Sequence, residues 1–288
     1  MENTHINIAQ LSRGLQSKLS PIYGEGEAKA MVRLIFHSLK GWNLTDMLIH
    51  ADTTASEYLV VKTEEILSRL LKHEPIQYIL NEAYFYGMNL KVNRSTLIPR
   101  PETEELVDLI VKENNDCKDL SVLDVGTGSG AIAIALSRNL PFSHVSAIDI
   151  SAKALTVAKE NAKDLHAKIN FMEADVFKYE PGSNIFDIIV SNPPYIDDSE
   201  KNDMDSNVLN YEPHSALFVP DDNPLIYYTR IATMALDSLK KDGKLYFEIN
   251  PRHAYELRSY LEREGFTDVS IVKDINGKDR FIKCRKSL

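Results

Sequence analysis

The feature that most constrains the fold is an apolar segment that runs directly into a cluster of glycines. Residues 121–125 are Ser-Val-Leu-Asp-Val, and an apolar run at residues 131–136 has the composition of a closely packed helix. Between them lies the loop Gly126, Thr127, Gly128, Ser129 and Gly130. Glycines at such a turn let a ligand approach the backbone, and the helix that follows presents free N–H groups. The pattern predicts a strand–loop–helix unit with a ligand site at the loop.

An acidic residue follows at the end of the next expected strand, residues 145–149. This residue is Asp149, roughly 20 positions beyond Gly126, the distance at which an acid binds ribose hydroxyls in nucleotide-binding α/β units. We therefore predict that Asp149 binds the ribose of a cofactor. The alternative is that it only caps the helix that Ser151 opens.

The glycine loop alone fits two classes of cofactor. Gly126, Gly128 and Ala131 match the dinucleotide-binding pattern with its permitted final alanine. Asp124, however, places a carboxylate just before the loop, where it would repel a pyrophosphate but tolerate a sulfonium and an α-ammonium group. These charges favour S-adenosylmethionine over a dinucleotide.

A third acidic position lies after the expected strand at residues 169–172. It is Asp175, which would accept a hydrogen bond from the adenine amino group, while Val176 and Phe177 would pack against the adenine ring. A loop-exposed aspartate beside a core phenylalanine explains the same spacing equally well. We include all three residues in the predicted cofactor site.

The expected strand at residues 186–191 ends in the corner Asn192, Pro193, Pro194 and Tyr195. Two prolines cannot continue a strand interior, and neither has an N–H, so the corner is stiff and rich in acceptors. Asn192 adds a side-chain carbonyl and Tyr195 a flat ring. Such a corner suits a planar NH₂ group on an sp² carbon, although an ordinary turn is the alternative. We predict these four residues to be catalytic, with Asn192 also touching the cofactor.

The chain divides into three parts. Residues 1–80 have helical periodicity and nearly balanced charge, with eight Lys and Arg against nine Asp and Glu, which favours a protein-binding over a nucleic-acid-binding module. Residues 81–102 contain a hairpin around Gly87 and a proline-rich linker. Residues 103–288 alternate helix and strand, which predicts a doubly wound α/β sheet. A turn at residues 274–277 indicates that the last two strands are antiparallel.

Two segments beside the expected site have more than one interpretation. Pro99 and Pro101 stiffen residues 97–104, which are either a rigid linker that caps a helix at Thr103 or a segment that closes over the cofactor. Residues 211–218 end a long polar loop after the corner, and loops of that length are often lids.

Composition limits the setting in which the protein works. The net charge of −9 weighs against a stable nucleic-acid partner. Cys117 and Cys284 match neither a metal nor a disulfide spacing, which indicates a reducing cytoplasm. The N-terminus lacks the pattern of a signal peptide, and no apolar run approaches the roughly 20 residues of a membrane span.

Together, several motifs resemble those of the bacterial release-factor glutamine methyltransferases, members of the class I S-adenosylmethionine-dependent methyltransferase superfamily. The resemblance covers nearly the whole chain and rests on residues 74–78, 85–87, 97–104, 124–130, 191–195, 211–213 and 216–218. The proline-rich linker joined to a helical N-terminal domain distinguishes this family from DNA adenine and ribosomal RNA guanine methyltransferases, which share the Asn-Pro-Pro-Tyr corner.

The resemblance implies a reaction and a partner. The reaction is methylation of the side-chain amide nitrogen of the glutamine in a Gly-Gly-Gln loop of class-1 peptide chain release factors, with the helical domain gripping the release factor. The alternative is a methyltransferase that acts on an amino group of a nucleic acid. The chain departs from the family at Val176, where many members have tryptophan, and at Asn250, where they usually have glycine.

Overall fold

The computed structural model describes residues 6–287, apart from the side chain of residue 203, and divides into two compact units. One unit comprises the chain up to Asn81 together with Ser206–Tyr211. The other comprises Glu82–Asp205 and the chain from Glu212 onward. The second unit contains every residue of the predicted site.

The first unit is helical, as the periodicity of its sequence predicts. Its helices are α1 (Ile8–Tyr23), α2 (Glu25–Lys40), α3 (Leu44–Ile49), α4 (Glu57–Leu70), α5 (Ile76–Leu80) and α9 (Ser206–Tyr211). Apolar faces meet in one core that includes Leu19, Ile35 and Phe36. Gly41 ends α2 in the left-handed region, at a φ of 68° that favours glycine.

The second unit is built on a seven-stranded sheet with the order β10-β11-β9-β6-β3-β4-β5. The strands are β3 (Ser121–Val125), β4 (His144–Asp149), β5 (Ile169–Glu173), β6 (Phe186–Ser191), β9 (Leu239–Glu248), β10 (Phe266–Lys273) and β11 (Asp279–Lys286). The five neighbouring strands β9, β6, β3, β4 and β5 pair in parallel, whereas β11 is antiparallel to both β9 and β10. The predicted fold class, including its antiparallel C-terminal pair, is confirmed.

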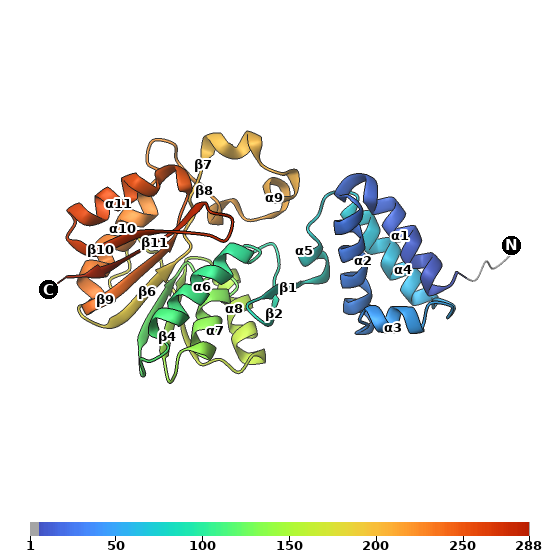
Figure 1. The fold of residues 1–288 in the computed structure, drawn as a ribbon, viewed down its shortest axis with the longest axis horizontal. Coiled ribbons are helices and arrows are strands. Elements are labelled where there is room, and N and C mark those ends of the chain that lie inside the picture. Colours follow the sequence, from blue (N-terminus) through green and yellow to red (C-terminus); the bar gives the residue numbers. More distant parts are fainter. Residues whose placement is uncertain (1–5, 288) are drawn as a thin grey trace. The chain divides into compact units, whose positions relative to one another are not determined.

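Helices cover both faces of this sheet (Figure 1). On one face α6 (Pro101–Asn114), α7 (Ala131–Asn139) and α8 (Ala152–Asp164) pack against the strands, and on the other α10 (Ile226–Ser238) and α11 (Ala254–Arg263) do so. Alternate strand residues therefore enter different cores: Val122 lies in the first core and Leu123 in the second. Central strands buried on both faces explain the near-continuous apolar runs in the sequence.

Helix α6 begins earlier than one sequence interpretation expects. Pro101 occupies its first turn and Arg100 its N-cap position, so Thr103 lies inside the helix and does not cap it. Proline suits this position because the first helical N–H groups have no intrahelical partner. The Thr103 side chain is therefore available for a contact elsewhere in the unit.

A hairpin precedes α6, formed by β1 (Glu82–Phe85) and β2 (Met88–Lys91). Asn161 of α8 fastens it, because its side chain accepts from the N–H of Lys91 at 2.7 Å and donates to the carbonyl oxygen of the same residue at 2.9 Å. The Asn161 amide also donates to the carbonyl of Ser129 at 2.9 Å. One buried side chain thus joins the hairpin to the glycine loop.

The segment after the Asn-Pro-Pro-Tyr corner is more ordered than the long polar loop expected from sequence. It holds the short parallel pair β7 (Ile196–Asp197) and β8 (Phe218–Val219), 3₁₀ turns at Asp198–Asp203 and His214–Ala216, and helix α9. Two-residue strands and single turns lack a periodic pattern long enough to recognise in a sequence.

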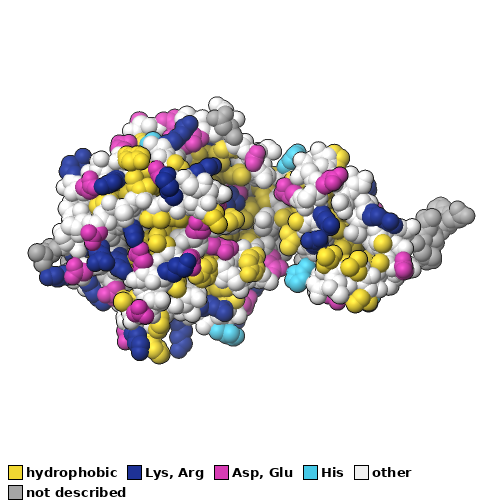
Figure 2. Space-filling view, viewed as in Figure 1, with side chains coloured by type: hydrophobic (Ala, Val, Ile, Leu, Met, Phe, Trp, Pro, Cys, Tyr) yellow, Lys and Arg dark blue, Asp and Glu magenta, His cyan; other side chains and the backbone are white. Residues whose placement is uncertain are grey.

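The face of the molecule in Figure 2 carries interspersed acidic and basic side chains on the sheet unit. Among the described residues, no helix has both the length and the apolar character needed to cross a membrane.

Gly130 allows a test of how tightly the glycine loop is packed. Its φ is +83°, and a Cβ atom there would lie 3.1 Å from Cδ1 of Ile134 and 3.2 Å from Cβ of Ala158. Gly277 has nearly the same φ, +80°, but open space around it. We expect Gly130→Ala to lower the free energy of unfolding by about 2–4 kcal/mol, because overpacking adds to the left-handed backbone cost. Gly277→Ala should cost only about 1–2 kcal/mol in the same urea titration. Equal losses would contradict the close packing.

Candidate active site

A cavity of about 310 Å³ lies at the carboxyl ends of β3, β4 and β6. The strand order reverses between β3 and β6, and ligands of open α/β sheets bind at such a point. The volume of this cavity is at the lower end of the range for pockets that bind small molecules. Ten of the residues that line it are Gly126, Gly128, Asp149, Asp175, Val176, Phe177, Asn192, Pro193, Pro194 and Tyr227.

The glycine loop presents only part of its length to this cavity. Gly126 and Gly128 line it, and a Cβ atom at either position would meet nothing within 4 Å. The side chains of Thr127 and Ser129 are buried in the protein instead, and Gly130 packs against α8. Gly126 and Gly128 thus form an open cradle that larger residues would partly fill.

Asp124 lies fully buried behind the loop, at 0% exposure. Its Oδ2 accepts from the Thr127 hydroxyl at 2.6 Å and from the N–H of Ala133 at 3.2 Å, whereas its Oδ1 is buried without a hydrogen-bond partner. Burial raises the pKa of Asp124 to about 7, even though the two hydrogen bonds oppose the shift. A nearby positive charge would stabilise the ionised form of this carboxyl group.

Asp149 lines the cavity from the end of β4. Its Oδ2 accepts from the N–H of Gly128 at 2.8 Å, and its Oδ1 accepts from the N–H of Ser151 at 2.8 Å. Burial raises the pKa of Asp149 above its usual value, while these N–H groups act in the opposite direction. Ser151, not Asp149, caps α8 through its side chain. Asp149 thus fixes the loop while it faces the cavity.

The segment after β5 supplies one wall of the cavity. Asp175, Val176 and Phe177 line it, and the Phe177 ring lies 5.3 Å from the ring of Tyr227 on α10. Arg230, also on α10, donates to the carbonyl of Val176 at 2.8 Å and so holds the segment in place. This wall joins apolar surface to one carboxylate.

The Asn-Pro-Pro-Tyr corner is only partly exposed to the cavity. Asn192, Pro193 and Pro194 line it, but Tyr195 does not. The Tyr195 ring packs with the core beneath α10, and its hydroxyl donates to Glu248 Oε1 at 3.0 Å. At the other end of the corner, Ser191 donates to the carbonyl of Val125 at 2.7 Å.

Several residues outside the predicted site hold this corner. Thr103 donates from its hydroxyl to Glu248 Oε2 at 2.6 Å and accepts from Nδ2 of Asn192 at 3.2 Å. Asn250 donates to the carbonyl of Tyr195 at 3.0 Å, although it lies outside the cavity. The sequence does contain one signal for these residues: Glu248 follows an apolar run at the end of β9. A charged residue buried in such a run requires hydrogen-bond partners.

The proline-rich segment and the segment after α9 meet through Glu212. Its carboxylate accepts from Nη2 of Arg100 at 2.5 Å and from the N–H of Ile98 at 3.2 Å. Leu97 on one segment and Pro213 on the other both line the cavity. The ion pair therefore joins two parts of the cavity wall that are distant in sequence.

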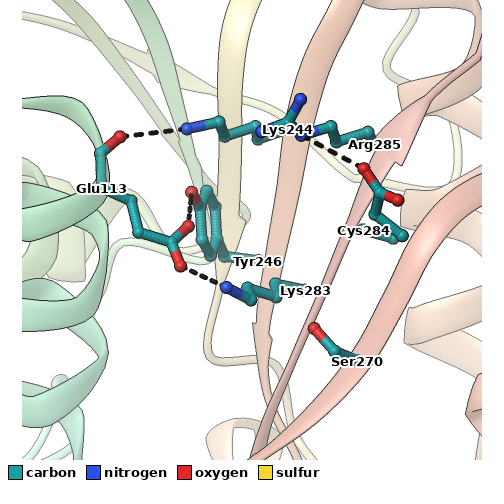
Figure 3. Close-up of a pocket in the computed structure, with 8 residues that line it drawn as sticks. Glu113, Lys244, Tyr246, Ser270, Lys283, Cys284 and Arg285 are labelled. Atoms are coloured by element: carbon teal, nitrogen blue, oxygen red, sulfur yellow. Dashed lines mark hydrogen bonds and ion pairs between the residues drawn. The ribbon is translucent and has the colours of Figure 1, made fainter.

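A second cavity, also of about 310 Å³, lies beside the C-terminal end of α6 (Figure 3). Glu113 accepts from Lys283 and from the Tyr246 hydroxyl, and Lys244 donates to the carbonyl of Glu113 at 3.1 Å. Lys244 also donates to Asn114 at 2.8 Å. Lys283 pairs with the Glu113 carboxylate and Lys244 binds the Glu113 carbonyl group at the helix end, which is a structural role.

The first cavity fits the cofactor that the sequence predicts. The cradle of Gly126 and Gly128 leaves room for a ligand, and the unpartnered oxygen of Asp124 supplies negative charge behind it. Asp149 offers a carboxylate, while Phe177 and Tyr227 offer rings. A ligand that combines a cation, hydroxyl groups and an aromatic base matches these chemical features.

Comparisons with known proteins identify the class. The family model of the methyltransferase small domain matches residues 103–211. A methyltransferase of Pyrococcus furiosus has the same fold at a TM-score of 0.52, with 16% identity over 78% of this chain and 100% of that chain. The family model assigns residues 103–211 to the methyltransferase class, and the likeness to the solved structure shows the shared fold.

Relatives identify the family. The PrmC N-terminal domain model matches residues 10–80. The chain is 46% identical to the release factor glutamine methyltransferase of Bacteroides thetaiotaomicron, over 94% of this chain and 98% of that protein. It is also 46% identical to the Streptococcus pneumoniae protein of the same name, over 96% and 98%. The chain belongs to the release factor glutamine methyltransferase family.

Removing the Glu212 carboxylate should loosen the cavity wall. Glu212→Ala leaves the buried N–H of Ile98 unpaired, which costs about 1–3 kcal/mol. We expect faster cleavage near residues 212–219 in limited proteolysis followed by mass spectrometry. Glu180→Ala, which removes an exposed pair with Arg230, is the matched control and should leave the cleavage rate unchanged. Equal rates in the two variants would rule out the joining role of Glu212.

Proposed function

We propose that the protein transfers a methyl group from S-adenosylmethionine to the side-chain amide nitrogen of the glutamine in the Gly-Gly-Gln loop of class-1 peptide chain release factors. The observation that carries the proposal is the acceptor-rich corner of Asn192, Pro193 and Pro194, which opens into the same cavity as the glycine cradle. Membership in the release factor glutamine methyltransferase family supports the choice of substrate.

The proposed cofactor residues divide the ligand among them. Gly126 and Gly128 leave space for the methionine part, with the carboxyl group of Asp124 behind them. Asp149 accepts from the ribose hydroxyls, because each of its oxygens has a lone pair beyond its bond to a backbone N–H. Asp175, Val176, Phe177 and Tyr227 hold the adenine. Thr127, Ser129 and Gly130 act indirectly by shaping the loop.

The proposed acceptor residues hold the glutamine amide. Its NH₂ group donates one hydrogen bond to Oδ1 of Asn192 and one to the backbone carbonyl of Pro193. Pro194 keeps the corner stiff, and Tyr195 fixes its far end through Glu248. Two acceptors in fixed positions define the plane of the amide and the direction of its nitrogen.

The chemistry of an amide explains why positioning is the main task. An amide nitrogen is a weak nucleophile because its lone pair is delocalised into the carbonyl group. The bound cofactor supplies an electrophilic methyl group on a sulfonium. Holding two reactants in line contributes several orders of magnitude to a rate. The acceptors of Asn192 and Pro193 also stabilise positive charge that develops on the NH₂ group, and the product amide then loses one proton.

The partner is the release factor, and we place the reaction in the cytoplasm, where release factors act on ribosomes. We propose that the helical unit binds the factor away from its glutamine. The alternative, methylation of a nucleic-acid amino group, is not favoured, because residues 10–80 match the PrmC N-terminal domain and residues 1–80 carry nearly balanced charge rather than an excess of basic residues.

The first experiment incubates the protein with a purified class-1 release factor and S-adenosylmethionine. We expect mass spectrometry of the digest to find a gain of one methylene on the Gly-Gly-Gln glutamine. Asn192→Ala should reduce turnover by roughly a hundredfold or more, because one of the two positioning acceptors is lost, with little change in the cofactor Kd. If the unaltered enzyme binds the cofactor but transfers no methyl group to the release factor, the proposed substrate is wrong.

The raised pKa of Asp124 predicts pH-dependent cofactor binding. S-adenosylmethionine carries a net positive charge near neutrality, so it binds the ionised carboxylate better than the neutral acid. With a free-enzyme pKa of about 7, the cofactor Kd should fall roughly fivefold between pH 6 and pH 7, with proton release on binding. Calorimetry in two buffers measures both quantities. Asp124→Asn should abolish the dependence, and a Kd that does not change with pH in the unaltered enzyme would contradict this role of Asp124.

A further inference from the structure

A chain of buried hydrogen bonds leads from β9 to the acceptor corner. Glu248 ends β9 at 1% exposure and Thr103 lies in the first turn of α6 at 4% exposure. The Thr103 hydroxyl lies 2.6 Å from Glu248 Oε2, and Nδ2 of Asn192 lies 3.2 Å from the Thr103 hydroxyl. All the residues that form this chain of hydrogen bonds belong to the sheet unit.

Burial raises the pKa of Glu248, whereas the hydroxyl donors of Thr103 and Tyr195 favour its ionised form, and ionised Glu248 gives this hydrogen-bond chain a direction. An ionised carboxylate accepts hydrogen bonds and donates none. The single hydroxyl proton of Thr103 must therefore point at Glu248, and the lone pairs of Thr103 remain to accept. The Tyr195 hydroxyl likewise donates to the second oxygen, at 3.0 Å. Both oxygens of Glu248 are thus committed to hydroxyl donors.

The direction of the chain decides which way the amide of Asn192 is turned. Its NH₂ group must face Thr103, because the opposite orientation would place the amide oxygen against a hydroxyl oxygen with no proton between them. The described residues donate no hydrogen bond to Oδ1 of Asn192, and Asn192 lines the cavity. The amide oxygen is therefore the atom that remains for a ligand.

We propose that Thr103 and Glu248 are positioning residues, which hold Asn192 with its side-chain oxygen available to the NH₂ group of the substrate. This inference rests on the proposed function, because the orientation matters only for a substrate that donates. A flipped Asn192 would present its own NH₂ group to the substrate NH₂ group, and two donors cannot bond. Neither positioning residue needs to touch the substrate.

Three substitutions separate orientation from packing. Thr103→Val keeps the shape of the side chain but removes the hydroxyl, whereas Thr103→Ser keeps the hydroxyl and is the matched control. Glu248→Gln keeps the size but introduces an NH₂ group, which can donate to Thr103 and so reverse the chain. Unchanged melting temperature and cofactor Kd identify variants that fold normally.

We expect a loss in kcat rather than in KM. Thr103→Val and Glu248→Gln should each lower kcat on the release factor about tenfold or more, with KM and cofactor Kd changed less than about threefold. Thr103→Ser should retain most activity. Because the two residues act through one chain, the double variant should be no slower than the slower single variant. Losses that multiply, or a Thr103→Ser variant as slow as Thr103→Val, would overturn the proposal.

A second measurement does not depend on turnover. In ¹⁵N NMR spectra, one side-chain NH₂ proton of Asn192 should exchange slowly with water in the unaltered protein and in Thr103→Ser, but quickly in Thr103→Val. Equal protection in all three would overturn the orientation even if the enzyme were active. If the unaltered enzyme transfers no methyl group but shows this pattern, the proposed function fails and the orientation stands.

Discussion

The reversal of strand order between β3 and β6 is the constraint on which the site depends. Because the chain leaves β3 toward one edge of the sheet and β6 toward the other, the loops after these strands diverge and leave a crevice. The glycine loop and the Asn-Pro-Pro-Tyr corner are the loops that border it. The hydroxyl of Ser191 donates to the carbonyl of Val125 and holds the two strand ends together at 2.7 Å. Cofactor cradle and acceptor corner are thus fixed relative to each other by the sheet itself.

Helix α6 adds a second constraint, because it is fastened to the sheet at both ends. At its start, Thr103 bonds Glu248, and at its end Glu113 and Asn114 bond side chains of the same strand, β9, at Tyr246 and Lys244. Positive side chains at a helix C-terminus are favourable because they face its free carbonyl groups. The ion pair and hydrogen bonds at the C-terminal end of the helix (Figure 3) therefore help to keep it in the register that places Thr103 beside Asn192.

Sequence patterns predicted the fold and the cavity residues that belong to local motifs. Gly126, Gly128 and Asn192 follow a strand and Asp149 ends one, so their approach to one sheet edge follows from parallel pairing alone. Tyr227, Glu248 and Thr103 could not be found in this way, because their contacts join residues distant in sequence and no local periodicity encodes them. Tyr195 shows the same limit. Its motif predicted a ring in the site, but which way that ring turns depends on Glu248, which is 53 positions away. Asn250 also holds the corner, by donating to the carbonyl of Tyr195, although it belongs to none of the motifs that predicted the site.

The acceptors of the Asn-Pro-Pro-Tyr corner also limit the kind of group that can bind there. Two prolines remove the N–H groups that would normally accompany their carbonyls, so the backbone at this point can only accept. If Asn192 is turned with its oxygen outward, the side chain there accepts as well. A carboxylate or a carbonyl oxygen placed in such a corner would meet lone pairs, whereas an NH₂ group would be satisfied at both protons. Under the proposed function the corner would select a planar NH₂ group, and it would not distinguish a glutamine from an adenine. Discrimination among NH₂-bearing substrates must come from surfaces outside the corner, such as the helical unit or the segment that Glu212 fastens.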